Sequence, residues 1–227
     1  MKKVVVLSGA GISAESGLKT FRDSDGLWEN YRIEDVATPE AWAKNRKLVL
    51  DFYNERRRQV MKAKPNAAHL ALANLQNKYD VNIITQNIDD LHERAGSKKV
   101  LHLHGEIFKS RSSINSSLVY TIEGTELNDG EKCDDGSQLR PHIVWFGEMV
   151  PALDEAALLV TKADIFIVIG TSLAVYPAAG LVHFASAESE KYFIDPAAVE
   201  INGFKSFREK AGSGVPGLVE KLMEELE

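Results

Sequence analysis

The feature that most constrains the fold of this chain is a series of six short, apolar segments rich in β-branched residues. Such runs are typical of strands that are buried on both faces of a parallel sheet. We expect strands at residues 4–7, 81–85, 100–103, 143–146, 165–169 and 192–194.

Helical patterns lie between these segments. We expect helices at 39–43, with Thr38 as N-cap, at 47–61, 67–76 and 154–161, and at 216–226, with Pro216 in the first turn. Alternation of strands and helices predicts an α/β fold with a Rossmann-like, doubly wound parallel sheet.

Two stretches interrupt this alternation. Residues 24–63 have helical patterns without a strand, and residues 106–140 are polar and rich in turn formers. We predict that both are insertions that together build a small second lobe. The main Rossmann-like domain would then comprise residues 1–23, 64–105 and 141–227.

Composition and charge exclude several classes of protein. The 27 Lys and Arg against 33 Asp and Glu give a net charge of -6, which offers no broad positive field for nucleic acid. The longest apolar runs are far below the ~20 residues that span a membrane. The N-terminus lacks the pattern of a secretory signal, so we expect a cytoplasmic location and no membrane partner. The single Cys133 can form neither an internal disulfide nor a zinc site of several thiolates.

The first predicted strand is followed by Gly9-Ala10-Gly11-Ile12-Ser13-Ala14, a Gly-x-Gly-x-x-Ala turn. Such a turn lets backbone amides approach a pyrophosphate, although a plain strand-to-helix turn has the same glycines. An ordinary dehydrogenase would carry an acidic residue at the end of a second strand ~20 positions on. The segment 15–23 reads as a loop instead, so hydride transfer is disfavoured.

Other polar residues follow the later predicted strands. Gln86, Asn87 and Asp89 come after 81–85, at the sheet edge where α/β proteins bind ligands, although Asp89 or Asp90 could instead cap the next helix. The turn 170–172, Gly-Thr-Ser, suits hydrogen bonds to ribose or phosphate oxygens, or is a plain turn.

Two histidines share one face of a predicted strand. His102 and His104 are two residues apart, so they could be a metal-ligating pair or hydrogen-bonded core residues. His104 precedes Gly105 at the strand end, which makes it the better candidate for a general base.

Together these segments resemble the sirtuins, the NAD-dependent protein lysine deacylases. Residues 9–22 resemble the family's GAGxSxxSGxxxFR signature, 85–89 its TQNxD, 104–105 its HG, 146–148 its FGE and 170–172 its GTS. The resemblance implies that NAD is bound by the main domain and consumed. The acyl group of an acyl-lysine protein would move to the ribose, giving nicotinamide, O-acyl-ADP-ribose and free lysine.

The resemblance also implies roles for individual residues. His104 would be the catalytic base, with Asn87 and Asp89 beside it, and Phe146, Gly147, Glu148 and Val175 would contact the substrate. The residues implied to bind NAD are Gly9, Ala10, Gly11, Ser13, Glu15, Thr20, Phe21, Arg22, Trp28, Gln86, Asn87, Ile88, Asp89, Gly170, Thr171, Ser172, Asp195 and Ala211.

One helix carries information on the acyl group. Tyr53 and Arg56 lie one turn apart on an apolar stripe, and Tyr53-x-x-Arg56 resembles the sirtuin subclass that removes succinyl and malonyl groups. A phenol and a guanidinium are apt partners for a terminal carboxylate. The alternative is an arginine that snorkels from the stripe, as we expect Arg57 and Arg58 to face water.

The chain departs from the family in its small lobe. Most sirtuins carry four zinc-binding cysteines there, whereas this chain has serines and one cysteine, so we expect no zinc. Two rival functions stay open: mono-ADP-ribosyl transfer at the same NAD site, and a noncatalytic module that binds NAD or ADP-ribose. A mere binder has no need of His104, Asn87 and Asp89 together.

Overall fold

The computed structural model describes residues 1–19, 27–28 and 31–225, with the side chains of residues 27 and 28 left undescribed. A six-stranded parallel sheet with the order β11-β10-β9-β1-β4-β5 forms its centre. The sheet confirms the expected Rossmann-like α/β fold. Its strands are β1 (Lys3–Ser8), β4 (Asp80–Thr85), β5 (Val100–His102), β9 (Ile165–Ile169), β10 (Glu190–Ile194) and β11 (Lys205–Phe207).

The order of the strands reverses beside β1. The chain runs from β1 outward through β4 to β5, then returns to β9 on the other side of β1 and continues to β11. Ser8, the last residue of β1, lies opposite Thr85 of β4 and Ile169 of β9. Ligands of such sheets bind at the carboxyl ends of the strands that flank the reversal.

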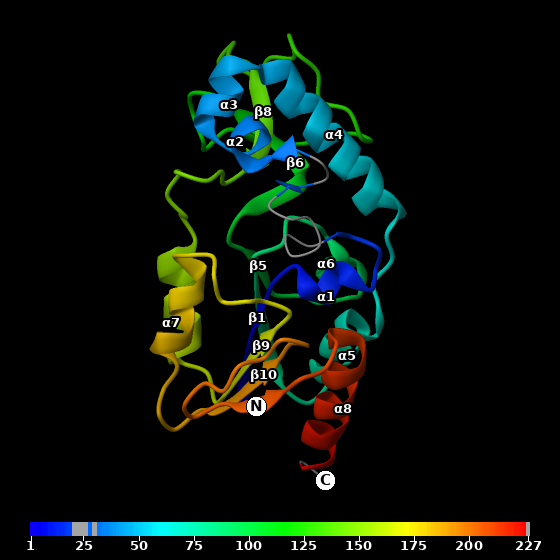
Figure 1. Ribbon diagram of the computed structural model, residues 1–227, viewed down its shortest axis with the longest axis vertical. Helices are drawn as coiled ribbons and strands as arrows, with labels where there is room; N and C mark the ends of the chain where they lie inside the picture. The colour runs from blue at the N-terminus through cyan, green and yellow to red at the C-terminus, as the bar shows by residue number, and fades with distance from the viewer. Residues whose placement is uncertain (20–26, 29–30, 226–227) are drawn as a thin grey trace.

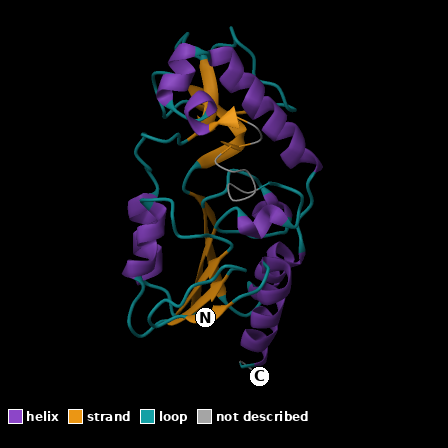
Figure 2. Cartoon of the chain, in the orientation of Figure 1, coloured by secondary structure: helices purple, strands orange, loops and turns teal. Residues whose placement is uncertain are grey.

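Helices cover both faces of the sheet (Figures 1 and 2). α5 (Ala67–Leu75) and α8 (Ala211–Glu224) share one apolar cluster with the strands. α7 (Leu153–Thr161) and the 3-10 helix η2 (Ala178–Phe184) pack in a second cluster on the other face. The strands are buried on both faces because apolar side chains on each face meet a helix layer.

Most of the predicted helices are present, and two of them begin directly after a residue whose side chain caps the first turn. Thr38 Oγ1 accepts a hydrogen bond from the Ala41 amide at 3.0 Å and begins α3 (Pro39–Lys44). Asn45 caps α4 (Arg46–Lys62) in the same way. The last predicted helix is present, but its predicted start was wrong, because α8 begins at Ala211 and Pro216 lies inside it.

The small sheet differs from the sequence prediction. β6 (Gly105–Ser112), β7 (Val119–Thr121) and β8 (Leu139–Ile143) form an antiparallel sheet with the order β7-β6-β8. The prediction of a parallel strand at 143–146 was therefore wrong, since the apolar run ends a strand that pairs with β6. The segment 24–63 was predicted to lack strands, but β2 (Leu27–Trp28) pairs with β3 (Tyr31–Arg32).

The two insertions share a core. Apolar residues of α2 (Ile33–Val36), α3 and α4 pack with Ile107, Ile143 and Trp145 in one cluster. No bounds were predicted for the two short helices near the main sheet, α1 (Gly11–Ala14) and α6 (Leu91–Arg94). Our exact division of the chain into domains stays a prediction.

A buried arginine holds α4 to the small sheet. Arg57 Nε donates to the Ile107 oxygen at 2.8 Å, and its Nη1 donates to Thr125 O at 2.7 Å and to Asn54 Oδ1 at 2.8 Å. Arg57 is 0% exposed, so the expectation that it faces water was wrong. Asn54 also exchanges two hydrogen bonds with the main chain of Leu127.

Among the residues that the structure describes, no helix has the length and apolar character needed to cross a membrane.

Candidate active site

A cavity of about 480 Å³ opens at the carboxyl edge of the large sheet and reaches the small lobe. Predicted residues from β1, β4, β9 and α4 meet on its walls. Those that line it are Gly9, Ala10, Gly11, Ser13, Tyr53, Arg56, Gln86, Asn87, Ile88, Asp89, His104, Phe146, Gly147, Glu148, Gly170, Thr171, Ser172 and Val175.

The floor of the cavity is a close approach of two glycine turns at the strand-order reversal. A Cβ atom added to Gly9 would lie 2.7 Å from Thr171 Cβ, and one added to Gly11 would lie 2.7 Å from Gly170 Cα. Gly170 has a positive φ of 61°, and a Cβ there would lie 2.7 Å from the carbonyl carbon of Gly11. Side chains at these three positions would force the turns apart.

The amides of the first turn are only partly available to a ligand. Gly9 N donates to Ile169 O at 2.9 Å, and Gly11 N donates to Gly170 O at 2.8 Å. Since these two amides fasten the turn to β9, the predicted phosphate cradle cannot use them in this conformation. Ala10 N makes no main-chain hydrogen bond with another described residue, so it is the amide of this turn that a phosphate could meet.

The side chains of Asn87, Ser13 and Asp89 form a hydrogen-bonded chain. Asn87 Nδ2 donates to Gly9 O at 3.1 Å and to Ser13 Oγ at 3.2 Å, and Ser13 Oγ donates to Asp89 Oδ2 at 3.0 Å. This chain of bonds joins the loop after β4 to the loop after β1. All three side chains are nearly inaccessible to solvent.

Asp89 accepts a capping-type hydrogen bond and also lines the cavity, so its role in ligand binding stays a prediction. Its Oδ1 accepts from the Leu91 amide at 3.2 Å, as a helix-capping side chain would, while Oδ2 faces Ser13 in the cavity. Asp90 is the N-cap residue of α6 but makes no side-chain cap. Burial raises the pKa of Asp89, and the bonds from Leu91 and Ser13 oppose that rise.

His104 is placed to accept a proton inside the cavity. Its Nδ1 lies 3.0 Å from the Gln86 main-chain oxygen. A carbonyl oxygen can only accept, so Nδ1 carries the hydrogen and Nε2 holds the lone pair. Burial lowers the pKa of His104 and outweighs the Gln86 bond, which raises it. The lowered pKa favours this neutral form.

His102 is not placed to serve as the base. Its Nδ1 lies 3.0 Å from Asn87 O and its Nε2 lies 2.8 Å from Glu93 Oε1. Both nitrogens face acceptors, which favours the imidazolium form of the ring. His102 is also not among the residues that line the cavity. Burial lowers the pKa of His102, but the Glu93 carboxylate and the Asn87 carbonyl together outweigh burial, so the pKa is raised above its usual value.

Gln86 joins the base to the opposite glycine turn. Its main-chain oxygen holds His104, and its Nε2 donates to Thr171 Oγ1 at 3.2 Å. Thr171 Oγ1 also accepts from the Leu173 amide at 3.2 Å. Ser172 is exposed at the cavity wall.

The small lobe supplies Tyr53 and Arg56 to the same cavity. Tyr53 is 0% exposed and Arg56 is 6% exposed, so Arg56 does not snorkel into solvent. Arg56 Nη1 donates to Gln59 Oε1 at 3.2 Å. Burial raises the pKa of Tyr53 well above its usual range, so the phenol stays protonated at neutral pH.

The Glu148 carboxylate anchors the 146–148 loop. It accepts from Arg140 at 2.7 and 3.0 Å and from the Trp145 amide at 2.8 Å, and Arg111 lies 3.3 Å away. These bonds occupy both oxygens, so the Glu148 carboxylate holds the loop. A contact with substrate would fall to the main chain of this loop or to Phe146.

Three predicted residues lie away from the cavity lining. Glu15 Oε2 accepts from the Gly212 amide at 2.7 Å at the start of α8, and Ala211 is buried beside it. Asp195 is 1% exposed and its Oδ1 accepts from Ala197 N at 2.8 Å. Thr20, Phe21 and Arg22 lie outside the described residues, as does the side chain of Trp28.

The sequence analysis missed Trp145. This residue lines the cavity, is 2% exposed, and donates from Nε1 to the Tyr53 hydroxyl at 3.1 Å. Its position directly before the 146–148 motif was the available signal.

The small lobe residues do not fit a zinc ion. Asp135 accepts from Ser112 Oγ at 2.7 Å, from Cys133 Sγ at 2.8 Å and from Ser137 N at 2.9 Å. Cys133 Sγ donates a hydrogen bond to this carboxylate, and one sulfur among serine hydroxyls is not the set of Cys and His ligands that a structural zinc takes. Within the described ranges, no three His, Cys, Asp or Glu side chains are grouped to hold a metal.

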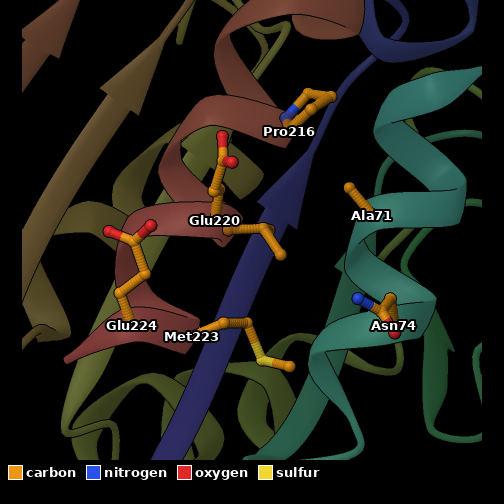
Figure 3. A pocket seen from close by; sticks show the side chains of 7 residues that line it. Ala71, Asn74, Pro216, Glu220, Met223 and Glu224 are labelled. Atoms are coloured by element: carbon orange, nitrogen blue, oxygen red, sulfur yellow. The ribbon is translucent and has the colours of Figure 1, made fainter. Parts of the chain in front are cut away.

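A second cavity of about 460 Å³ lies between α5 and α8, away from the predicted site. Asn74 of α5 and Met223 of α8 lie on its two sides (Figure 3). None of the predicted site residues lines it.

Comparison with known proteins identifies the family. The model of the Sir2 family matches residues 9–177. A protein of Helicobacter pylori named NAD-dependent protein deacylase is 55% identical over 227 residues, which cover 99% of each chain. A protein of Bacteroides thetaiotaomicron with the same name is 50% identical, over 98% of this chain and 99% of its own.

Solved structures agree with this result. The crystal structure of a Sir2 homologue in complex with NAD superposes with a TM-score of 0.89 at 42% identity, covering 100% of this chain and 91% of that one. The family match, these identities and the shared fold lead to one conclusion: this chain belongs to the Sir2 family.

Proposed function

We propose that this protein is an NAD-dependent protein-lysine deacylase that prefers acyl groups with a terminal carboxylate, such as succinyl and malonyl. The deacylase activity is supported by relatives of that name at 50 to 55% identity over nearly the whole chain. The observation that supports the acyl preference is that His104, Tyr53 and Arg56 line one cavity.

The cavity suits NAD at its glycine floor. Gly9, Gly11 and Gly170 let the two turns approach each other closely enough to form that floor. The Ala10 amide would meet a phosphate, and the Asn87–Ser13–Asp89 chain of hydrogen bonds would orient the nicotinamide ribose and carboxamide. Bound NAD supplies the ribose carbon that accepts the acyl oxygen.

His104 would take the proton from a ribose hydroxyl. Its Nε2 holds the lone pair, and the bond from Nδ1 to Gln86 fixes the ring. The lowered pKa of His104 keeps the ring neutral at the pH of the reaction. This geometry favours an enzyme over a noncatalytic NAD-binding module.

Acyl choice would depend on Tyr53 and Arg56. A carboxylate on the acyl chain could accept from the neutral phenol and pair with the guanidinium, whereas an acetyl group offers neither interaction. Arg56 is 6% exposed, so its charge has little contact with water, and a carboxylate beside it would offset part of that desolvation where an apolar group would not.

The test is a panel of acetyl, malonyl and succinyl peptides of one sequence, incubated with NAD and followed by nicotinamide release and by mass spectrometry of the peptide. We expect kcat/KM to be higher for the succinyl and malonyl peptides. Nicotinamide release with the peptide carrying a new ADP-ribosyl group would point to ADP-ribosyl transfer. Equal or better turnover of the acetyl peptide would reject the acyl preference alone.

A further inference from the structure

Trp145 contacts the residue that we propose reads the acyl group. Its indole Nε1 lies 3.1 Å from the Tyr53 hydroxyl oxygen, and both side chains are buried on the same cavity wall. An indole N–H can only donate, so the Tyr53 oxygen is the acceptor of this bond.

We propose that Trp145 is a positioning residue for acyl choice, which holds the Tyr53 hydroxyl so that its hydrogen is offered to the carboxylate of the acyl group. A hydroxyl has one hydrogen and two acceptor sites. When Trp145 occupies an acceptor site, the hydrogen must point to another partner. This inference rests on the proposed preference for acyl groups with a carboxylate.

The indole of Trp145 is itself held firmly. The Arg140 guanidinium lies 3.4 Å from its ring centroid, and the Trp145 amide donates to Glu148 Oε2 at 2.8 Å. Arg140 in turn pairs with both oxygens of Glu148 and donates to Ile143 O at 3.0 Å. Because Arg140 holds the face of the indole and Glu148 holds the Trp145 main chain, the indole N–H can fix the orientation of the Tyr53 hydroxyl.

The charges around Tyr53 agree with a donor role. Arg56 follows Tyr53 by one turn of α4, lines the same cavity and acts on the Tyr53 phenol through its charge, so an anion drawn to Arg56 would arrive near that hydroxyl. A misdirected hydroxyl would present its lone pairs to that anion, which is repulsive. Trp145 therefore adds to discrimination as well as to binding.

The experiment compares Trp145→Phe, Tyr53→Phe and the double variant on succinyl and acetyl peptides with NAD. Phenylalanine keeps a ring beneath Arg140 and removes the N–H. We expect Trp145→Phe to lower kcat/KM for the succinyl peptide about threefold to tenfold, mainly through KM, and to change acetyl turnover by less than about twofold. In the Tyr53→Phe background the same change should leave the succinyl-to-acetyl ratio unaltered, because no hydroxyl is left to orient.

Trp42→Phe is the matched control, since Trp42 packs 5.8 Å from the Trp145 ring but does not line the cavity. Should Trp145→Phe fold poorly, benzothienylalanine at position 145 keeps both rings and replaces the N–H with sulfur. Equal loss on both peptides, or a further loss of the ratio in the Tyr53→Phe background, would overturn the inference. A wild-type enzyme without activity on succinyl and malonyl peptides would instead reject the acyl preference, and this inference with it.

Discussion

The Nδ1 atom of His104 lies 3.0 Å from the main-chain oxygen of Gln86, and this contact determines which ring nitrogen can accept a proton. The same residue, Gln86, reaches Thr171 with its side chain. His104 is thus tied through Gln86 to the 170–172 turn at the cavity floor. Its orientation depends on the main chain after β4 rather than on another ionisable group.

His104→Ala should lose at least about a hundredfold in deacylation while it keeps its affinity for NAD, because proton transfer is removed and the glycine floor is unchanged. Nicotinamide release measures the first quantity and calorimetric titration with NAD the second. Turnover close to that of the wild type would place the base elsewhere.

The His102–Glu93 contact should make stability depend on pH. The pKa of His102 is raised because Glu93 and the Asn87 carbonyl outweigh the effect of burial. Glu106 adds to the rise. A raised pKa gives stabilisation that is complete below the unfolded value of about 6.5 and is lost as pH rises through the folded value.

We therefore expect the difference in Tm between wild type and His102→Gln to be largest near pH 6 and to shrink toward pH 9. Thermal unfolding followed by circular dichroism across this range measures it. His183→Gln, at an exposed position, is the control. A difference that is constant with pH would mean that His102 is not an imidazolium in the folded state.

Neighbouring arginines on α4 should differ sharply in their contribution to stability. Arg57→Met would leave the buried carbonyl of Ile107 and the partly buried carbonyl of Thr125 without their donor, and the loss of a buried partner costs ~1 to 3 kcal/mol. We expect the free energy of unfolding in urea to fall by about 2 to 4 kcal/mol. Arg58→Met, at a partly exposed surface pair with Glu55 and Glu126, should change it by less than about 0.5 kcal/mol. Similar losses for the two variants would contradict this account.

These arginines also mark the limit of sequence reasoning. The apolar stripe on α4 correctly predicted that Arg56 faces inward, because helical spacing alone places it one turn after Tyr53. It could not predict the burial of Arg57. The partners of Arg57 are Ile107 and Thr125, which lie 50 and 68 positions away and approach α4 only when the small sheet forms.

The strands show the same contrast. The five predicted strands of the large sheet are identified by continuous apolar runs that need no knowledge of their partners. The run at 143–146 has the same composition, but its neighbour is the antiparallel β6. Composition indicates burial, while the direction and partner of a strand depend on the rest of the chain.

Chelation should leave the protein folded and active. The Asp135 carboxylate accepts three hydrogen bonds, and the one from Cys133 in particular holds its pKa well below the usual range. We expect elemental analysis to find no stoichiometric zinc and excess EDTA to leave Tm and turnover unchanged. One zinc per chain would contradict this prediction.

Arg56→Met is the sharpest test of acyl choice, because methionine retains the apolar stem of the buried side chain and removes the guanidinium. If Arg56 pairs with the carboxylate of a succinyl-lysine, the change removes charge-assisted hydrogen bonds worth ~1.5 to 3 kcal/mol. We expect kcat/KM for the succinyl peptide to fall at least about tenfold, since each ~1.4 kcal/mol is one decade, while acetyl turnover holds or improves. Tyr53→Phe should act in the same direction and more weakly, as it loses one neutral donor.

Arg58→Met is the matched control on the same helix and should leave the ratio of the two activities unchanged. Equal loss of both activities in Arg56→Met would mean that Arg56 supports the helix, through contacts such as the one to Gln59, rather than reads the acyl group.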